Sequence, residues 1–233
     1  MKKIDFAPWK KLGFEFLSIF IAVISAFALN NWNDNRNADK SESKILIEIA
    51  NGLEKDLEDI KQNEKGHKQG ISACKYFRDA MSNKNVTSDS LMIHYNNLTR
   101  DYISIQNTAG YQTLKSRGLE LIKNDSLRLK IISLYEFDYQ ILRKLEEEYY
   151  EMQFHKNYFK EINKSILPNF NFDENNMISG VNLPLKMPIE EKKILLMYLL
   201  KIQGNRNFIL SFYAQIENKI TEVQKSINQE IKH

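Results

Sequence analysis

The chain has 233 residues, which suits one domain with an appendage. A mean hydropathy of −0.48, with only 8 Gly and 4 Pro, excludes a multi-span membrane protein and a collagen-like or linker sequence. A single cysteine, Cys74, excludes an internal disulfide framework and a zinc ribbon. The net charge of +3 resides in residues 1–11, so the rest of the chain is neutral and lacks the basic excess that nucleic-acid binding needs.

The strongest signal is an apolar run near the N-terminus, which predicts a transmembrane helix over residues 12–33. No charged residue interrupts its last 18 positions. As a helix the run is roughly 30 Å long, about one hydrocarbon thickness. Trp9 and Trp32 bracket it, as indoles do at the two membrane interfaces, and Asn30 and Asn31 precede the second indole.

The charge distribution predicts the orientation of this span. Residues 1–11 form a basic cytoplasmic tail, and the positive-inside rule then places residues 34–233 across the inner membrane, in the periplasm. The basic residues of the tail are Lys2, Lys3, Lys10 and Lys11. Two alternatives remain open, namely a secretory signal cleaved after Ala28 and a core helix of a soluble protein.

Glu15 lies about one turn inside the cytoplasmic edge of the span. An intramembrane carboxylate can mark a proton or ion path. It can also lie at the headgroup level, beside Lys10 and Lys11 and close to the positive end of the helix dipole. We favour the second interpretation, because no output domain of the kind that proton-driven stator proteins require follows the span.

The rest of the chain predicts an all-α fold, an elongated antiparallel bundle of three long helices plus short helices. A heptad seam from Leu53 to Met81 predicts a helix over about residues 38–82, weakened or kinked near Gly66 and Gly70 because the seam is polar there. Short helical pieces over residues 90–122 supply a fourth column.

A second long helix is predicted from about residue 125, with N-cap side chains in Asn124–Ser126 and Pro168 at its end. Its predicted buried face comprises Ile131, Leu134, Ile141, Leu145, Tyr149, Met152, Phe159, Ile162 and Ile166. Residues 168–188 form a connector loop that either caps the bundle or is mobile. The last helix opens at Glu190 and has a seam of Phe208, Phe212, Tyr213, Ile216, Ile220, Val223, Ile227 and Ile231.

Two stretches resemble a known family. Glu15–Ile19 and Ala26–Asp34 resemble the start of a Bacteroidota family of single-span proteins of unknown function, domain-of-unknown-function family 6090, in which the span ends in an Asn-Asn-Trp-Asn-Glu-like run. Tyr111–Gly118 is similar to the Tyr-x-Thr-Leu-Lys-Ser-x-Gly turn of that family, and Asp125–Arg128 matches the segment after it. The family has no assigned reaction, so the resemblance implies a topology and no chemistry.

The turn Tyr111–Gly118 is also the interaction site that the sequence favours most. Gly118 follows Arg117 where a helix should end in a left-handed residue, a conformation that glycine adopts without strain. The other polar members of the turn are Thr113, Lys115 and Ser116. They either cap neighbouring helices, which we favour, or form a partner surface.

No catalytic, cofactor-binding or metal-binding residue is predicted. Glu147, Glu151 and His155 share a helical face, but the Glu-x-x-His pattern of carboxylate bundles is missing. His67 and Cys74 are interpreted as a seam histidine and a small core thiol. No Gly-rich phosphate loop or nucleophile motif occurs in the sequence.

We therefore expect a non-enzymatic, membrane-anchored scaffold that binds the lipid bilayer and either a protein partner or a second copy, without a cofactor and without nucleic acid. Polar seam residues (Glu64, His67 and Arg78) favour a partner over a closed monomer. The alternative is a ligand-sensing bundle that signals through the span to a separate effector.

Overall fold

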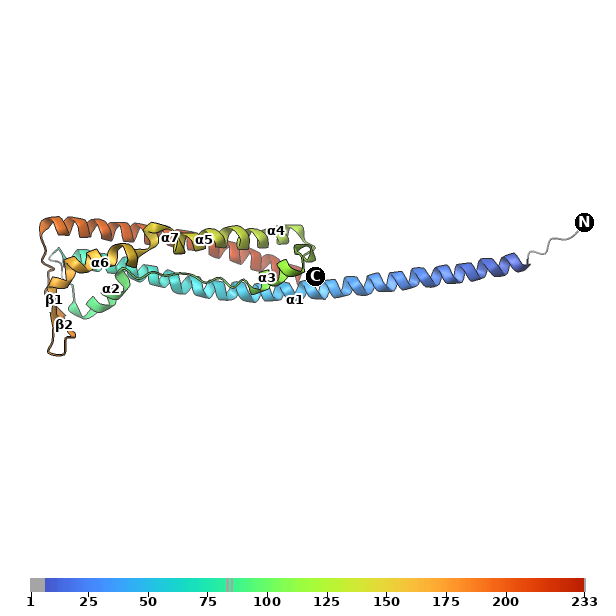
Figure 1. Ribbon diagram of the computed structural model, residues 1–233, viewed down its shortest axis with the longest axis horizontal. Helices are drawn as coiled ribbons and strands as arrows, with labels where there is room; N and C mark the ends of the chain where they lie inside the picture. Colours follow the sequence, from blue (N-terminus) through green and yellow to red (C-terminus); the bar gives the residue numbers. More distant parts are fainter. Residues whose placement is uncertain (1–6, 83, 85, 233) are drawn as a thin grey trace, which may run out of the picture.

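A computed structural model describes residues 7–82, 84 and 86–232, with side chains from residue 14 onward. One helix, α1 (Ala7–Ala80), contains both the apolar run and the first helix of the bundle (Figure 1). Helix α7 (Ile189–Glu230) returns antiparallel to it, so the C-terminus lies where α1 enters the bundle (Figure 1). The predicted all-α class with a bundle behind an N-terminal apolar helix is confirmed.

Two short helices and an extended segment form a column against α1. After the 3-10 turn η1 (Ser88–Ser90), α2 (Leu91–Leu98) packs on the distal part of α1. Residues 99–108 then run back along the bundle in extended form, and α3 (Ala109–Arg117) packs on α1 near its entry into the bundle. Short pieces over residues 90–122 thus supply the fourth column, and we call residues 99–108 the strap.

The second long column is a chain of short elements rather than one helix. They are α4 (Asp125–Ser133), the π-helical segment η3 (Leu134–Asp138), α5 (Tyr139–Glu147), and, after the 3-10 turn η4 (Tyr150–Met152), α6 (Phe154–Ile166). Two further 3-10 turns are η2 (Leu119–Leu121), before α4, and η5 (Leu167–Asn169), after α6. The prediction of a single helix from 125 to 166 is wrong.

The π-helical segment also changes which face of the column is buried. A π turn inserts an extra residue into the helix, so the side chains after it are rotated around the axis. Consequently Tyr139 and Leu142 are buried, whereas Ile141 and Leu145 of the predicted face are half-buried and Tyr149 is exposed. In α7 the predicted seam is correct from Phe212 onward, but Phe208 at its start is exposed.

The predicted weak point of α1 near Gly66 and Gly70 is not a break, because α1 continues through both positions. The two glycines instead admit neighbouring side chains. A Cβ on Gly66 would lie 2.2 Å from the ring of Tyr102, and a Cβ on Gly70 would lie 2.3 Å from Nε of Arg206. The glycines therefore allow close packing of the strap and of α7 on α1.

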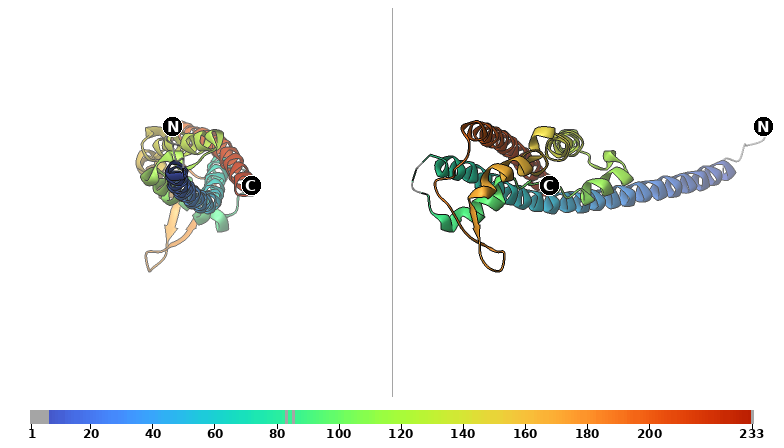
Figure 2. Two further views of the ribbon diagram at one scale, coloured as in Figure 1. Left: turned by 90° about the vertical axis from the view of Figure 1, so that its right-hand side faces the viewer. Right: turned by 60° about the vertical axis from the view of Figure 1, so that its left-hand side comes forward.

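The connector contains a β-hairpin where the sequence predicts a loop. Strands β1 (Phe170–Phe172) and β2 (Ile178–Val181) are antiparallel, with Phe170 opposite Val181 and Phe172 opposite Ile178. These strands are too short to show a clear alternation in the sequence. The hairpin projects sideways from the end of the bundle farthest from the N-terminus (Figures 1 and 2).

Candidate functional site

The apolar part of α1 extends alone beyond the bundle (Figure 1). Its most apolar 18-residue stretch has a mean hydropathy of 1.7, and none of this stretch is buried. Among the described residues it belongs to the one helix that is long and apolar enough to cross a membrane. Large apolar side chains from Phe14 to Trp32 are about half or more exposed, which is the surface that a lipid environment would cover.

The predicted anchor residues lie along this exposed part of α1. Glu15, Asn31 and Trp32 are all exposed. The Asn30 side chain donates a hydrogen bond to Asp34 Oδ2 at 3.0 Å, and the guanidinium of Arg36 lies 5.7 Å from the centre of the Trp32 ring. The side chains of Trp9, Lys10 and Lys11 lie outside the described residues.

In the predicted interaction turn, Tyr111 is part of the core. Its ring is only 2% exposed and stacks on Tyr135, with 4.5 Å between the ring centres. The Tyr111 hydroxyl donates to Glu136 Oε1 at 2.9 Å, and Lys115 Nζ lies 2.8 Å from the same oxygen. Both groups therefore join α3 to the π-helical segment.

The remaining polar members of the turn bond within α3 or lie in solvent. Thr113 donates to the carbonyl of Ala109 at 3.0 Å, and Ser116 donates to the carbonyl of Thr113 at 2.8 Å. Arg117 is exposed. Gly118 has φ 102° and ψ 128°, so the predicted positive φ is present, but its ψ differs from that of a left-handed helical cap.

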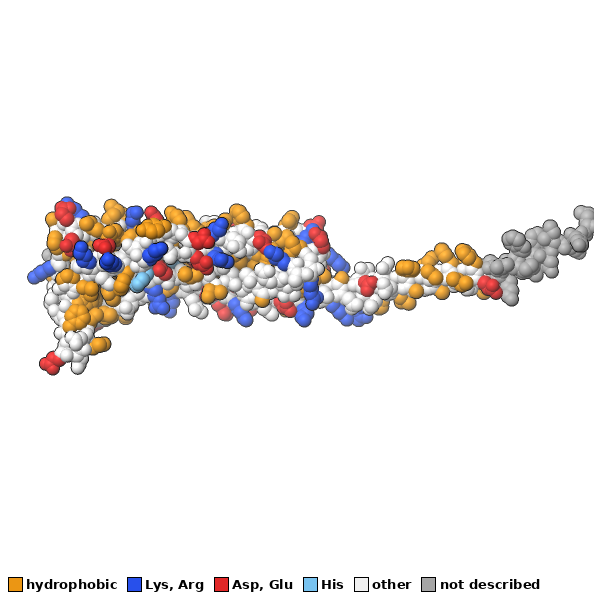
Figure 3. Space-filling model, in the orientation of Figure 1, with side chains coloured by type: hydrophobic (Ala, Val, Ile, Leu, Met, Phe, Trp, Pro, Cys, Tyr) orange, Lys and Arg blue, Asp and Glu red, His pale blue; other side chains and the backbone are white. Residues whose placement is uncertain are grey.

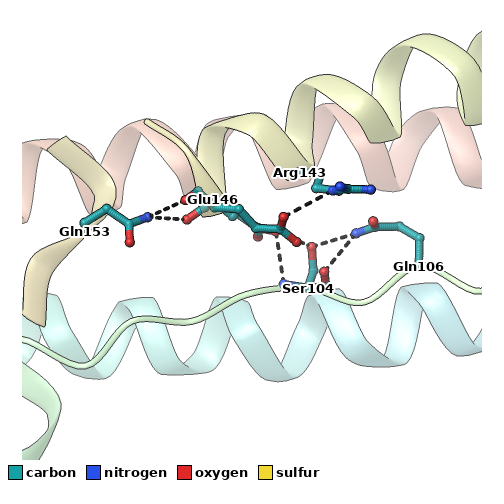
Figure 4. Close-up of polar contacts among 6 residues, drawn as sticks. Ser104, Gln106, Arg143, Glu146 and Gln153 are labelled. Atoms are coloured by element: carbon teal, nitrogen blue, oxygen red, sulfur yellow. Dashed lines mark hydrogen bonds and ion pairs between the residues drawn. The ribbon is translucent and has the colours of Figure 1, made fainter. Parts of the chain in front are cut away.

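A buried carboxylate, Glu146, fixes the middle of the strap. Its Oε2 accepts hydrogen bonds from the backbone N–H of Ser104 at 3.0 Å and from the Ser104 hydroxyl at 2.8 Å (Figure 4). Its Oε1 accepts from the hydroxyl of Tyr213 in α7. Glu146 thus connects α5, α7 and the strap at a point where all three meet.

Two opposing effects act on the pKa of Glu146. Burial raises the pKa of Glu146 to about 7, although its hydrogen bonds from Tyr213 and Ser104 lower it. Glu146 is only 4% exposed, so solvent contributes little to stabilising the ionised form. Its ionisation therefore falls near neutral pH, well above the ordinary range of a glutamate.

Two aspartates of α1 hold the strap farther along. Asp56 accepts from the backbone N–H of Asn107 at 2.6 Å and from the hydroxyl of Tyr139 at 2.7 Å. Asp59 accepts from the backbone N–H of Ile105 at 2.9 Å. Burial raises the pKa of Asp56 to about 6, and its two hydrogen bonds oppose that rise. The extended backbone of the strap is thereby satisfied by side chains instead of by a sheet partner.

The start of the strap is held by Arg206, which is fully buried in α7. Its Nη2 donates to the carbonyl oxygens of Leu98 and Arg100 at 3.1 and 2.9 Å, and it also lies 3.3 Å from that of Asn97. The guanidinium packs 4.4 Å from the centre of the Phe154 ring. Carbonyls at the end of α2 carry the negative end of the helix dipole, so they compensate the buried positive charge.

His67 is the second partner of Arg206. The two side chains are 3.1 Å apart, from Nη1 to Nδ1. Since a guanidinium only donates, Nδ1 accepts and the proton of His67 is on Nε2. Burial and the charge of Arg206 lower the pKa of His67 to about 3, so the ring is neutral. His67 is thus a buried seam histidine, as predicted. Because this chain itself encloses it, His67 does not support the predicted partner surface.

The described residues contain no group of three or more His, Cys, Asp or Glu side chains that could hold a metal ion. Glu147 ends α5, and His155 belongs to α6, so the predicted shared helical face of Glu147, Glu151 and His155 does not exist. Cys74 is buried, and burial raises the pKa of its thiol to about 11. The buried side chains of Glu146, Asp56 and Arg206 contact the strap or its start.

Sequence reasoning missed Arg206 and Glu146 as central residues. Both carry a signal that is visible in retrospect, because each occupies a helical position four residues from buried apolar side chains, Ile202 and Leu142 respectively. A charged residue at such a position must find a buried partner. Ser104 lies in a polar, irregular stretch, and its pairing with Glu146 across 42 residues left no local pattern.

Comparison with known proteins gives one match. The sequence model described as "Family of unknown function (DUF6090)" matches residues 15–171, from the apolar part of α1 to the first strand of the hairpin. Searches of curated proteins and of solved structures find no match. Because the matched region covers well over half of the chain, the protein belongs to this family of unknown function, DUF6090.

Proposed function

We propose that the protein is a membrane-anchored, non-enzymatic interaction scaffold, with residues 1–11 in the cytoplasm, a single span over residues 12–33 in the inner membrane, and the bundle in the periplasm. The observation that carries the proposal is the continuity of α1, which is one helix from Ala7 to Ala80. The same helix is exposed and apolar at one end and forms the core of the bundle at the other.

This continuity has a mechanical consequence. Helical residues join the apolar run to the bundle without a Gly or Pro between Trp32 and the first buried residues of α1. The part of α1 from Trp32 to Ala80 is roughly 70 Å long at about 1.5 Å per residue. Because α1 joins the bundle rigidly to the span, the sides of the bundle stay at a fixed height above the bilayer. A fixed height suits a scaffold.

The interior supports a structural role over a catalytic one. Glu146, Asp56 and Arg206 each make several hydrogen bonds to the strap or its neighbours. One surface hollow of about 580 Å³ is lined along α1 alone, over residues 39–48. These groups fix the shape of the bundle rather than surround a space in which a substrate could react.

A second proposal, that the bundle senses a ligand and signals through the span, is favoured by the same continuity of α1. A rotation or tilt of the bundle would pass directly into the membrane segment. The short cytoplasmic tail would then require a separate effector protein. The two proposals differ in whether a binding event changes the span or only holds a partner in place.

Recovery of partners from native membranes tests the scaffold proposal. The full-length chain, tagged at its C-terminus, is cross-linked in intact cells, extracted in mild detergent and analysed by mass spectrometry. The control is Arg206→Glu, which keeps the span but places a negative charge against the buried carbonyls and so disrupts the bundle.

We expect a protein partner or a second copy that the wild-type chain retains and Arg206→Glu loses. A wild-type chain recovered alone, at the mass of a monomer, would contradict the proposal. A partner retained equally by both chains would show that the span alone mediates the contact, which also contradicts a scaffold role for the bundle.

A further inference from the structure

A row of lysines lies on the outer face of α6. Lys156, Lys160 and Lys164 follow one another at intervals of four residues and are all exposed. Among the described residues none of the three takes part in an ion pair. Like charges at this spacing repel each other and destabilise a helix. The row is therefore a surface that an anionic partner would stabilise.

The neighbouring helix α7 carries exposed apolar side chains. Ile194, Met197 and Leu200 are 51, 54 and 59% exposed. Helices α6 and α7 pack side by side at this level, where the rings of Tyr158 and Tyr198 are 5.3 Å apart. In Figure 3, basic side chains over α6 and hydrophobic ones over the adjacent part of α7 lie on the same face of the bundle, with some acidic side chains among them. We call this face the α6/α7 surface.

The hairpin is acidic, in contrast to the basic row on α6. Residues 170–181 contain two acids, Asp173 and Glu174, and no base. Next to them Phe172 and Met177 are 56 and 65% exposed, although they are large and apolar. The acidic tip with hydrophobic side chains behind it stands clear of the bundle in Figure 3. Within the described residues, neither acid takes part in an ion pair. Asp173 Oδ1 accepts hydrogen bonds from the backbone N–H groups of Asn175 and Met177, each at 2.9 Å, so Asp173 also holds the turn.

The two surfaces match in charge and in apolar content, and they lie at the same end of the bundle (Figure 1). Within one copy the hairpin projects away from α7 (Figures 1 and 2). Two copies anchored by the same span stand parallel in one membrane, so the hairpin of one copy meets a neighbour at the height of the neighbour's α6/α7 surface.

We propose that the protein associates with a second copy of itself, side by side in the membrane, by placing the hairpin of one copy on the α6/α7 surface of the next. The carboxylates of Asp173 and Glu174 pair with the lysine row, and the apolar side chains of the hairpin cover those of α7. This inference rests on the proposed scaffold function and specifies its partner.

Charge reversal in two differently tagged, full-length copies tests the contact in native membranes. One variant reverses the net charge of the hairpin tip and leaves Asp173 in its turn (Glu174→Lys with Asn175→Lys). The other reverses the row (Lys156→Glu, Lys160→Glu and Lys164→Glu). The matched control reverses three exposed lysines of α1, at positions 55, 61 and 65. The readout is the amount of one tag recovered with the other, and circular dichroism checks that each variant remains helical.

We expect each reversed variant to lose self-association by at least about ten-fold, because the two facing surfaces then carry net charge of the same sign. Mixing the two variants should restore association, since each hairpin then meets a surface of opposite charge. The α1 control should associate like wild type.

Three results would overturn the inference: a wild-type chain that does not associate with itself, reversed variants that associate normally, or a mixture that fails to recover. The scaffold proposal would survive each of these results if the wild-type chain still retained another protein that Arg206→Glu loses. The two proposals therefore fail on different observations.

Discussion

Replacing Glu146 with glutamine should remove most of a pH dependence that this residue gives to the stability of the bundle. Burial raises the pKa of Glu146 from an ordinary 4.5 to about 7 in the folded chain. Between these two values the folded chain binds a proton that the unfolded chain has lost. The contribution of Glu146 to the free energy of unfolding is therefore most favourable below about pH 4.5 and falls as the pH rises through 7.

The two pKa values set the size of the effect. A pKa shift of one unit corresponds to about 1.36 kcal/mol. Between about pH 5 and pH 8, the ionisation of Glu146 alone therefore lowers the free energy of unfolding by about 2.5 kcal/mol. Asp56, with a pKa of about 6, adds a smaller loss of the same sign. Glutamine keeps the shape of the side chain and cannot ionise. The variant Glu146→Gln should therefore lack the loss that comes from Glu146 and keep the loss that comes from Asp56.

Urea unfolding of the full-length chain in a nonionic detergent, at pH 5 and pH 8, measures this difference. The fall in unfolding free energy from pH 5 to pH 8 should be about 2.5 kcal/mol larger for wild type than for Glu146→Gln. Glu147→Gln is the control, because Glu147 is the exposed neighbour on the same helix. Equal pH dependence in wild type and Glu146→Gln would show that the three hydrogen bonds fully offset burial, and would refute the reasoning.

Three further changes test other parts of the fold. Gly118→Ala should lower the unfolding free energy by about 1 kcal/mol, because alanine is strained at the positive φ of this position. The control Gly204→Ala, at a helical position with open space around it, should not lower the unfolding free energy. Equal effects of the two substitutions in urea unfolding would contradict this prediction. Gly70→Ala should cost about 2 kcal/mol by displacing Arg206, and an unchanged melting temperature would contradict the close packing. Arg206→Leu leaves buried carbonyls without a hydrogen-bond donor, so it should lower the unfolding free energy by about 3 kcal/mol. It should also speed limited proteolysis within the strap. Cleavage at the wild-type rate would contradict the role of Arg206 in holding the strap.

Regular apolar spacing predicted the long helices well. The seams of α1 and α7 recur at helical intervals, and Asn124 caps α4 as its sequence indicated, by accepting from the N–H of Leu127 at 3.1 Å. The interruption at residues 134–138 could not be predicted in this way, because a π turn keeps the hydrophobic content and changes only the phase. Likewise the hairpin has too few residues to show a period.

The polar interior was the hardest part to predict. Gly66 and Gly70 suggested weakness, whereas their function is to admit Tyr102 and Arg206 from segments far away in the sequence. The partners of Glu146 also come from two separate segments, the strap and α7. Such contacts depend on tertiary packing, and a single sequence carries no local pattern for them.

Mass spectrometry of the chain in alkaline-washed membranes tests the central claim, that a retained span anchors the bundle. The account predicts that the chain stays in the washed membranes and that peptides from residues 12–28 remain part of it. A soluble chain that begins at Leu29 would contradict the account, because the apolar run would then be a cleaved signal and not an anchor.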